Sequence, residues 1–393
     1  MKPVTVGPAG RAAYECDLHS HTTRSDGNDT PRESIDRAAA RGLRALAITD
    51  HDVLPPAEVS LPDGSVREIH AYAGERGVCL LRGIEFSCET EIQDVHIVGL
   101  GCDWEGPDMA REVARIAESK SGSYLELIRR LNERGYRIDL AELLAAGGRE
   151  IPVAELQKKA IFDYMAAKGY VSAWSEAKLL VREDPALNVE REKPGALRII
   201  EAIHRAGGTA ILAHPYLIDE QVRFQGERIG RWRLIERLAG AGLDGMEVRY
   251  TYDKTTCKDR RPPEAIWAEV RSRMPEGLFV SGGSDYHADY KKGQDNPRDL
   301  GECGLTMEEF LSVPVFARLY RTGGEDERDC GDQMARPRRP GRKDGVAAAC
   351  GRSLQHRQVC AGIPGIRARA DGRAHHRLQP DQPGALHGAQ QHL

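Results

Sequence analysis

Seven short runs of β-branched and other apolar residues recur along the chain, and helical patterns follow most of them. The runs predict strands over residues 14–18, 45–49, 78–81, 95–100, 209–213, 243–248 and 278–281. Helices are expected at 31–41, where Thr30 is a suitable N-cap, and at 194–206, which ends at Gly207-Gly208. This alternation of strands and helices is typical of a parallel α/β fold.

The alternation is interrupted once, between about residues 105 and 193. This interval reads as helical throughout, and residues 124–134 place Leu125, Ile128 and Leu131 on one face of a helix. We interpret it as a helical insertion that forms a lid over the mouth of a barrel. The barrel itself is predicted to comprise residues 12–104 and 194–315.

The C-terminal part of the chain differs in composition from the rest. No aromatic Phe, Trp or Tyr follows Tyr320, and residues 333–393 hold eleven Lys and Arg against three acids. Such a segment cannot bury enough apolar surface to offset its ordering entropy, so residues 316–393 are predicted to be a disordered basic tail. A basic arm that binds nucleic acid is the alternative, and a shifted reading frame would also produce this mixture.

Composition narrows the class of protein. The chain has 393 residues, 40% of them hydrophobic and 30% charged, which is enough to bury a core. We expect no membrane span, because no apolar run reaches 18 residues, and no secretory signal in Met1 to Arg11. Nine cysteines without a CxxC pair fit free thiols in the cytoplasm. Gly282-Gly283 forms no phosphate-binding loop, which argues against ATP or NAD.

Six histidines stand at or just beyond predicted strands, and acids accompany them. These histidines are His19, His21, His51, His96, His214 and His287. Asp26, Glu85 and Asp285 are among the acids nearby. The carboxyl ends of barrel strands converge on one mouth, and imidazole with carboxylate is the ligand set of zinc, manganese or iron. The sequence therefore predicts a metal site at the barrel mouth.

The segments DLHSHTTRSDG, ITDHD, GIEFS, VHIVGLG, LAHP and GGSDYH, taken together, resemble the successive motifs of the PHP (polymerase and histidinol phosphatase) superfamily. The resemblance covers about residues 14–310. It implies a distorted seven-stranded (β/α) barrel, in agreement with the seven predicted strands. The helical insertion resembles that of the metal-dependent phosphoesterase branch that acts on small molecules.

The resemblance implies a cluster of two to three divalent ions, which could be Mn, Zn or Fe. The first metal would be held by His19, His21, Glu85 and Asp285. The second would be held by Glu85, His96 and His214, with Glu85 bridging the two. The third would be held by Asp26, His51 and His287. Asp50 and Asp52 would orient His51 or carry protons.

Such a cluster suits attack of a metal-activated hydroxide on phosphorus, because paired metals activate water and clamp the reacting oxygens. Either His214 or Asp50 could give a proton to the leaving oxygen. Arg249, Lys254 and Lys158 are predicted to bind the substrate phosphate. Nucleotide phosphatases of the family carry Arg-x-His where this chain has Gln157-Lys158-Lys159-Ala160, which counts against a nucleoside 3′,5′-bisphosphate as substrate.

We therefore expect a metal-dependent phosphoesterase that hydrolyses a small phosphorylated metabolite. The substrate would be a nucleotide or sugar phosphate, as a monoester or a cyclic phosphodiester. A mouth enclosed by a lid disfavours nucleic acid polymers. The alternatives are a nuclease acting on RNA or DNA ends and a non-catalytic regulatory module that binds metal, although the complete set of nine ligands argues against the latter. The oligomeric state is left open.

Overall fold

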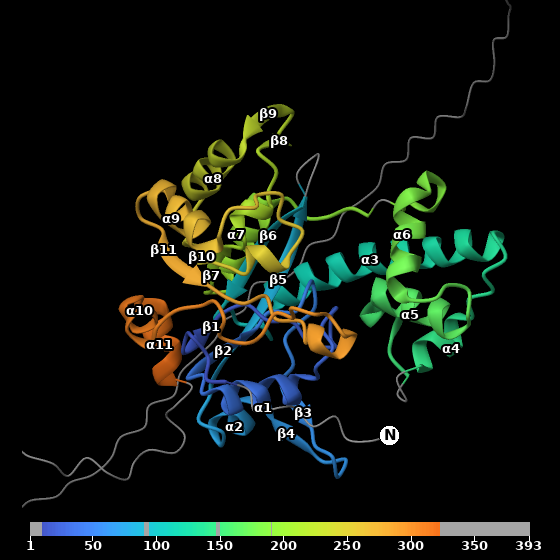
Figure 1. The fold of residues 1–393 in the computed structure, drawn as a ribbon, viewed down its shortest axis with the longest axis horizontal. Helices are drawn as coiled ribbons and strands as arrows, with labels where there is room; N and C mark the ends of the chain where they lie inside the picture. Colours follow the sequence, from blue (N-terminus) through green and yellow to red (C-terminus); the bar gives the residue numbers. More distant parts are fainter. Residues whose placement is uncertain (1–9, 90–93, 147–149, 190, 323–393) are drawn as a thin grey trace, which may run out of the picture. The chain divides into compact units, whose positions relative to one another are not determined.

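The computed structural model describes residues 10–89, 94–146, 150–189 and 191–322, all within one compact unit (Figure 1). Its centre is a seven-stranded sheet in the order β1-β2-β5-β6-β7-β10-β11. These strands are β1 (Cys16–Asp17), β2 (Ala45–Ile48), β5 (Cys79–Glu89), β6 (Asp94–Leu100), β7 (Thr209–Leu212), β10 (Gly245–Arg249) and β11 (Phe279–Gly282). All seven predicted strands are present.

Strand direction departs from the prediction at β6. The other neighbouring strands pair in parallel, whereas β6 is antiparallel to both β5 and β7. The reason is chain length, because β6 begins too few residues after β5 for the crossover that a parallel connection needs. The reversal brings the beginning of β6, where His96 lies, to the same end of the sheet as the carboxyl ends of its neighbours.

The first and last strands nearly close the sheet into a barrel. The backbone N–H of Leu18, just after β1, donates to the carbonyl of Gly282 in β11 at 3.2 Å, and Ser20 forms a parallel bridge with Tyr286. Buried side chains from β2, β5, β6 and β7 meet in one cluster, as a closed sheet requires. The predicted seven-stranded barrel is confirmed.

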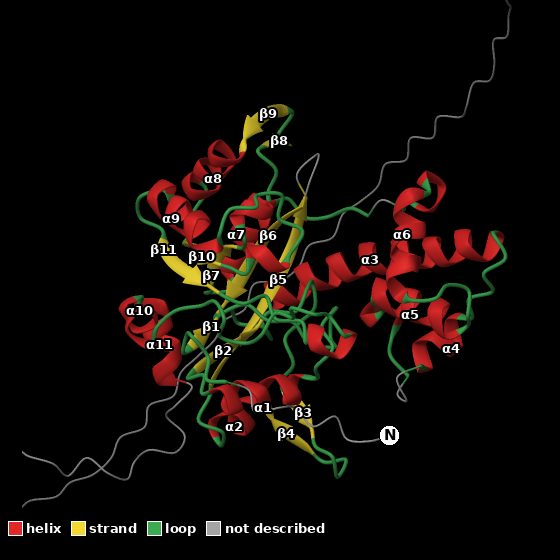
Figure 2. Cartoon of the chain, viewed as in Figure 1, coloured by secondary structure: helices red, strands yellow, loops and turns green. Residues whose placement is uncertain are grey.

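Helices cover the outside of the sheet (Figure 2). They are α1 (Pro31–Arg41), α2 (Ile69–Gly74), α7 (Ala196–Arg205), α8 (Arg231–Gly240), α9 (Pro263–Arg273), α10 (Met307–Ser312) and α11 (Pro314–Thr322). The chain also forms two small antiparallel hairpins outside the main sheet. One pairs β3 (Glu58–Ser60) with β4 (Val66–Glu68), and the other pairs β8 (Gln221–Phe224) with β9 (Glu227–Gly230). Thr30 caps α1 and forms a capping box with Glu33, as its sequence indicates.

The interval predicted to be an insertion is helical. It contains α3 (Pro107–Glu133), α4 (Leu140–Ala145), α5 (Lys158–Ala167) and α6 (Trp174–Glu183), which share a buried cluster of their own. The apolar face of α3 is made by Leu127, Ile128 and Leu131, while Leu125, which we placed on that face, is 38% exposed. The contacts that tie this region to the barrel include Arg191 to Asp52 at 2.8 Å and Gln157 to the carbonyl of Arg24 at 3.1 Å.

The predicted boundary of the tail at residue 315 is wrong. Helix α11 crosses it, because Phe316 is fully buried and stacks on Phe310 with ring centroids 5.2 Å apart. The rest of the predicted tail, from residue 323, lies outside the described residues. Within the described part of the chain, no helix combines the length and the apolar character that crossing a bilayer demands.

Candidate metal centre

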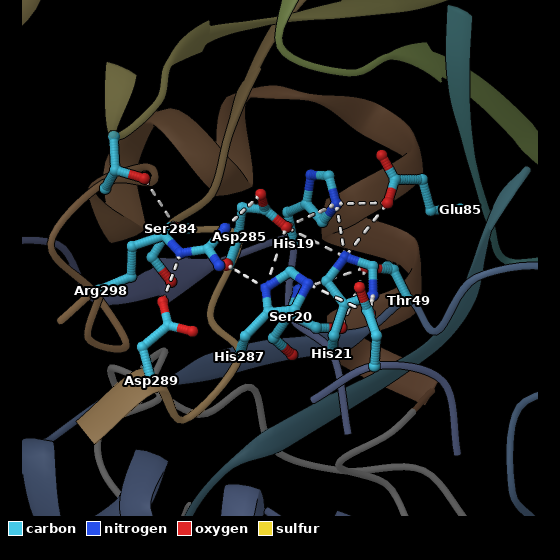
Figure 3. Close-up of polar contacts among 12 residues, drawn as sticks. His19, Ser20, His21, Thr49, Glu85, Ser284, Asp285, His287, Asp289 and Arg298 are labelled. Carbon is cyan, nitrogen blue, oxygen red and sulfur yellow. Dashed lines mark hydrogen bonds and ion pairs between the residues drawn. The ribbon is translucent and has the colours of Figure 1, made fainter. Parts of the chain in front are cut away.

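Glu85, a buried residue of β5, lies among imidazoles at the barrel mouth. Figure 3 shows its contacts with two of them, His19 and His21. One carboxylate oxygen, Oε2, is 3.1 Å from the Nε2 atoms of His19 and His21 and from Nδ1 of His51. The other, Oε1, is 2.8 Å from Nδ1 of His96 and 2.9 Å from Nε2 of His214. Five rings from four segments of the chain thus converge on one carboxylate.

Two further carboxylates complete the cluster. Asp285 Oδ1 is 3.0 Å from His21 Nε2, and Asp26 Oδ1 is 3.2 Å from His287 Nε2. Ligand atoms within 4.8 Å of one another form three groups. The groups are His19-His21-Glu85-Asp285, His51-Glu85-His96 and His21-Asp26-His51-His287. The first equals the predicted set. The second contains His51 where His214 was predicted, and the third adds His21 to the predicted Asp26, His51 and His287.

The donor set of this cluster fits divalent metal ions. Imidazole nitrogens and carboxylate oxygens point at shared positions, and the Nε2 atoms of His19 and His21 face each other at 3.1 Å. Burial alone would lower the pKa of His21, but hydrogen bonds with Asp285 and Glu85 outweigh it and raise this pKa to about 10. At His51 burial prevails and lowers the pKa to about 4. Positive charge therefore stabilises the buried carboxylates, either as protons on the rings or as metal ions bound between rings and carboxylates.

The far side of Asp285 is held by a cation and a phenol. Its Oδ2 accepts hydrogen bonds from Arg298 at 2.7 Å and from Tyr250 at 2.6 Å, and Arg298 also contacts Asp289 (Figure 3). These bonds leave Oδ1 directed at the histidines. Asp285 and His214 have φ values of 51° and 29°, a left-handed backbone that is uncommon for non-glycine residues and that occurs often at functional sites.

Glu247, in β10, supports two ligands from behind and was missed by our sequence reasoning. One of its carboxylate oxygens accepts from Nδ1 of His19 at 2.8 Å, and the other accepts from the backbone N–H of His214 at 2.7 Å. The first contact fixes the tautomer that directs His19 Nε2 into the cluster. A signal was available, because Glu247 is an acid between the apolar Met246 and Val248 of a predicted strand, where it must face the barrel interior.

A cavity of about 260 Å³ lies beside the cluster, between the barrel mouth and the helical insertion. Asp26 and His51 line it from the metal centre. Six cations line it as well, and they are Lys120, Lys158, Lys159, Lys178, Arg191 and Lys292. Tyr124, Phe162 and Trp174 add aromatic surface. The cavity therefore combines metal ligands with positive charge and apolar walls, as a site for an organic anion does.

The family model for the PHP domain matches residues 17–229 of the chain. This chain belongs to the PHP domain family. It is 32% identical to a 5′-3′ exoribonuclease of Haemophilus influenzae over 69% of this chain and 89% of the relative. It is also 32% identical to a 3′,5′-nucleoside bisphosphate phosphatase of Chromobacterium violaceum, over 71% of this chain and 89% of that protein.

A solved structure has the same fold as this PHP chain. It is an amidohydrolase from Chromobacterium violaceum with bound sulfate and no metal, 27% identical, with a TM-score of 0.56. The match covers 78% of this chain and 96% of that one. The resemblance stated from the sequence motifs is confirmed, and so is the prediction of an enzyme that hydrolyses phosphoesters.

Asp50 of the PHP chain occupies a place that does not suit the predicted proton donor. It is buried, and its carboxylate accepts hydrogen bonds from the Thr22 N–H and hydroxyl, both at 2.7 Å, and from the Ser25 hydroxyl at 2.6 Å. A carboxylate with these partners fixes the loop that carries Asp26. Asp52 is likewise engaged, by the Ser87 N–H and by Arg191.

Two of the three predicted phosphate-binding cations lie away from the cavity. Arg249 forms two hydrogen bonds with Glu309, at 2.6 and 2.8 Å, and Lys254 pairs with Glu302 at 2.7 Å. Both carboxylates belong to the segment after β11. The sequence around Arg249 and Lys254 therefore could not predict that these cations are paired. Lys158, the third prediction, does line the cavity.

The substitution Glu247→Gln is expected to lower metal affinity by about 10- to 100-fold, because loss of an outer-shell partner releases the orientation of His19. Metal titration of the purified protein measures the effect. Glu236→Gln is the matched control, since Glu236 lies on the exposed face of α8 beside Arg233. Equal metal affinity in both variants would contradict the positioning role of Glu247.

Proposed function

We propose that this PHP chain hydrolyses a small phosphorylated molecule, as a monoester or a cyclic phosphodiester, at the cluster around Glu85. The observation that carries the proposal is the continuity of the cluster with the cation-lined cavity, since Asp26 and His51 belong to both. A cavity of about 260 Å³ suits a small molecule. The bisphosphate phosphatase relative supports the same class of substrate.

The side chains divide the work in this proposal. Divalent metals held by the His, Asp and Glu ligands would supply Lewis acidity to the phosphate and activate water. Lys158 would bind phosphate oxygens from the insertion side, in place of Arg249 and Lys254. His214 is retained as the proposed proton donor to the leaving oxygen and not as a metal ligand, because it lies outside the three groups of ligand atoms and because Asp50 is occupied by Thr22 and Ser25.

The substitutions His19→Ala and Asp285→Asn are expected to abolish phosphate release, because each removes a proposed ligand from the buried cluster. The measurement is hydrolysis of 4-nitrophenyl phosphate by protein supplied with Mn, Zn or Fe, followed by a screen of nucleotides, sugar phosphates and cyclic phosphates. His70→Ala is the control, since His70 lies on α2 and outside all three ligand groups. Turnover that survives both ligand substitutions would overturn the proposal.

Hydrolysis of RNA ends is a second candidate function. The exoribonuclease relative favours it, and the aromatic side chains of Tyr124, Phe162 and Trp174 give the cavity surfaces on which a base could stack. The two candidates differ in the length of the preferred substrate. A 5′-phosphorylated oligonucleotide that is turned over faster than the matching mononucleotides would establish this second function in place of the first.

We also propose a cytoplasmic location. Six cysteines lie within the described residues, and none forms a disulfide with another of them, as is usual in a reducing compartment.

A further inference from the structure

Arg298 is a cation beside the metal centre to which the proposed reaction gives no role. Its side chain is 14% exposed and lies between two carboxylates, Asp285 and Asp289. One terminal guanidinium nitrogen donates to Oδ2 of Asp285 at 2.7 Å, and Nε donates to Oδ2 of Asp289 at 2.8 Å. Figure 3 shows Arg298 on one side of Asp285, with His19 and His21 on the other. Arg298 therefore contacts a predicted metal ligand from the side away from the histidines.

The two carboxylate oxygens of Asp285 have different partners. Oδ2 accepts hydrogen bonds from Arg298 at 2.7 Å and from the hydroxyl of Tyr250 at 2.6 Å. A carboxylate oxygen has about two lone-pair sites, so these two donors fill Oδ2. Oδ1 instead faces imidazole nitrogens, at 3.0 Å from His21 and 3.5 Å from His19. Asp285 can therefore offer a metal ion one oxygen and not both.

Asp289 holds the guanidinium of Arg298 in this position. It is a buried residue, and its second oxygen lies 3.8 Å from the ammonium of Lys292. A guanidinium suits the place because it is planar, stays charged and presents several donors in a fixed arrangement, so it can bond two carboxylates at once. The ammonium of a lysine is a point charge without this fixed arrangement. The side chain at this position is thus matched to orienting Asp285.

We propose that Arg298 is a positioning residue of the metal centre, which together with Tyr250 makes Asp285 a ligand through Oδ1 alone. The proposal rests on the same metal centre as the proposed function. Ligation through one oxygen suits an ion with few ligands, such as Zn²⁺. It is less suited to Ca²⁺, which takes about six to eight oxygens and often binds both oxygens of a carboxylate. Arg298 thereby contributes to the selection of the metal ion.

Arg298 has two opposing effects on metal affinity. Its positive charge repels a cation, so the charge alone predicts that removal of Arg298 strengthens the binding of every divalent ion. Its hydrogen bond orients Asp285, and loss of such support lowers metal affinity by about 10- to 100-fold. We expect orientation to dominate, because Asp289 already balances the charge of the guanidinium at 2.8 Å.

The test is calorimetric titration of the chelator-treated, full-length protein with Zn²⁺ and with Ca²⁺. Arg298→Met is expected to weaken Zn²⁺ binding by about 10- to 100-fold. Ca²⁺ binding should stay equal or strengthen, because Oδ2 becomes available, so the ratio of the Ca²⁺ Kd to the Zn²⁺ Kd should fall by at least about tenfold. Arg298→Lys keeps the charge and should recover part of this ratio. Tyr250→Phe, which frees the other site on Oδ2, should lower the ratio as well.

Arg37→Met is the matched control and should leave both affinities unchanged. The side chain of Arg37 is also 14% exposed and pairs with an aspartate, Asp299, which lies outside the three ligand groups. Stronger Zn²⁺ binding by Arg298→Met, or an equal loss for Zn²⁺ and Ca²⁺, would overturn the proposal. A loss of the same size in Arg37→Met would do so too. Should Arg298→Met fail to fold, an unchanged ratio in both Arg298→Lys and Tyr250→Phe would overturn it.

Metal titration requires no substrate, so it separates this proposal from the proposed function. Phosphate release is measured in parallel on the same proteins. A wild-type protein that selects Zn²⁺ through Arg298 but releases no phosphate would contradict the proposed function and leave the role of Arg298 intact. Phosphate release by a protein whose metal binding is insensitive to Arg298 would do the reverse.

Discussion

The substitution Glu85→Gln is expected to reduce hydrolysis by at least about 100-fold and to lower the metal content of the purified protein. Loss of a residue that only supports a metal ligand lowers metal affinity or activity by about 10- to 100-fold. Glu85 lies inside the cluster, so its loss should have at least the upper effect. Its two oxygens contact five imidazoles, so glutamine would remove the negative charge that these rings share. The glutamine amide would also direct N–H donors at ring nitrogens that themselves point inward.

Two measurements check this expectation, elemental analysis for bound metal and phosphate release from an aryl phosphate. Glu105→Gln makes the same chemical change at an exposed carboxylate that contacts Arg82, and it should leave both readouts unchanged. A Glu85→Gln protein that retains its metal and its activity would mean that the cluster around Glu85 is not the reaction centre.

Removal of metal is expected to abolish activity and to make stability fall with rising pH. In the metal-free cluster, hydrogen bonds with Asp285 and Glu85 overcome burial and raise the pKa of His21 to about 10. A raised histidine pKa contributes stability that is complete below the ordinary value of about 6.5 and is lost as the pH rises through about 10. The metal-free protein should therefore be less stable at pH 9 than at pH 6.5.

Bound metal should reverse this trend, because metal and proton compete for the same ring and metal binding strengthens as the proton leaves. Metal at 1,000 times its Kd would add about 4 kcal/mol to the free energy of unfolding. Thermal unfolding at pH 6.5, 8 and 9 with chelator and with added metal measures both effects, and re-addition of metal should restore activity. Identical Tm profiles with and without metal would contradict a metal centre built from these ligands.

The sequence determined the strands and most of the site. Runs of β-branched residues mark each strand locally. A histidine or an acid at the end of a parallel strand reaches the barrel mouth, because these strands share one direction. The residues at the start of the reversed strand β6 reach the same mouth. That is why His19, His51 and Glu85 could be placed together before any coordinates existed. The helical insertion was equally visible, since a 3.6-residue period is a local property.

Tertiary structure alone decided which charges are available. The guanidinium of Arg249 and the ammonium of Lys254 follow a strand as expected, yet Glu309 and Glu302, distant in the sequence, neutralise them. Asp50 is bound by Thr22 and Ser25 in the same way.

Lys120 is an ordinary helix residue in the sequence. Its Nζ is buried without a hydrogen-bond partner among the described residues, in a cavity between the insertion and the barrel mouth. Residue type and spacing fix what a side chain can do and on which element it lies. Which group pairs with that side chain depends on contacts between segments far apart in the chain, and no local pattern encodes these contacts.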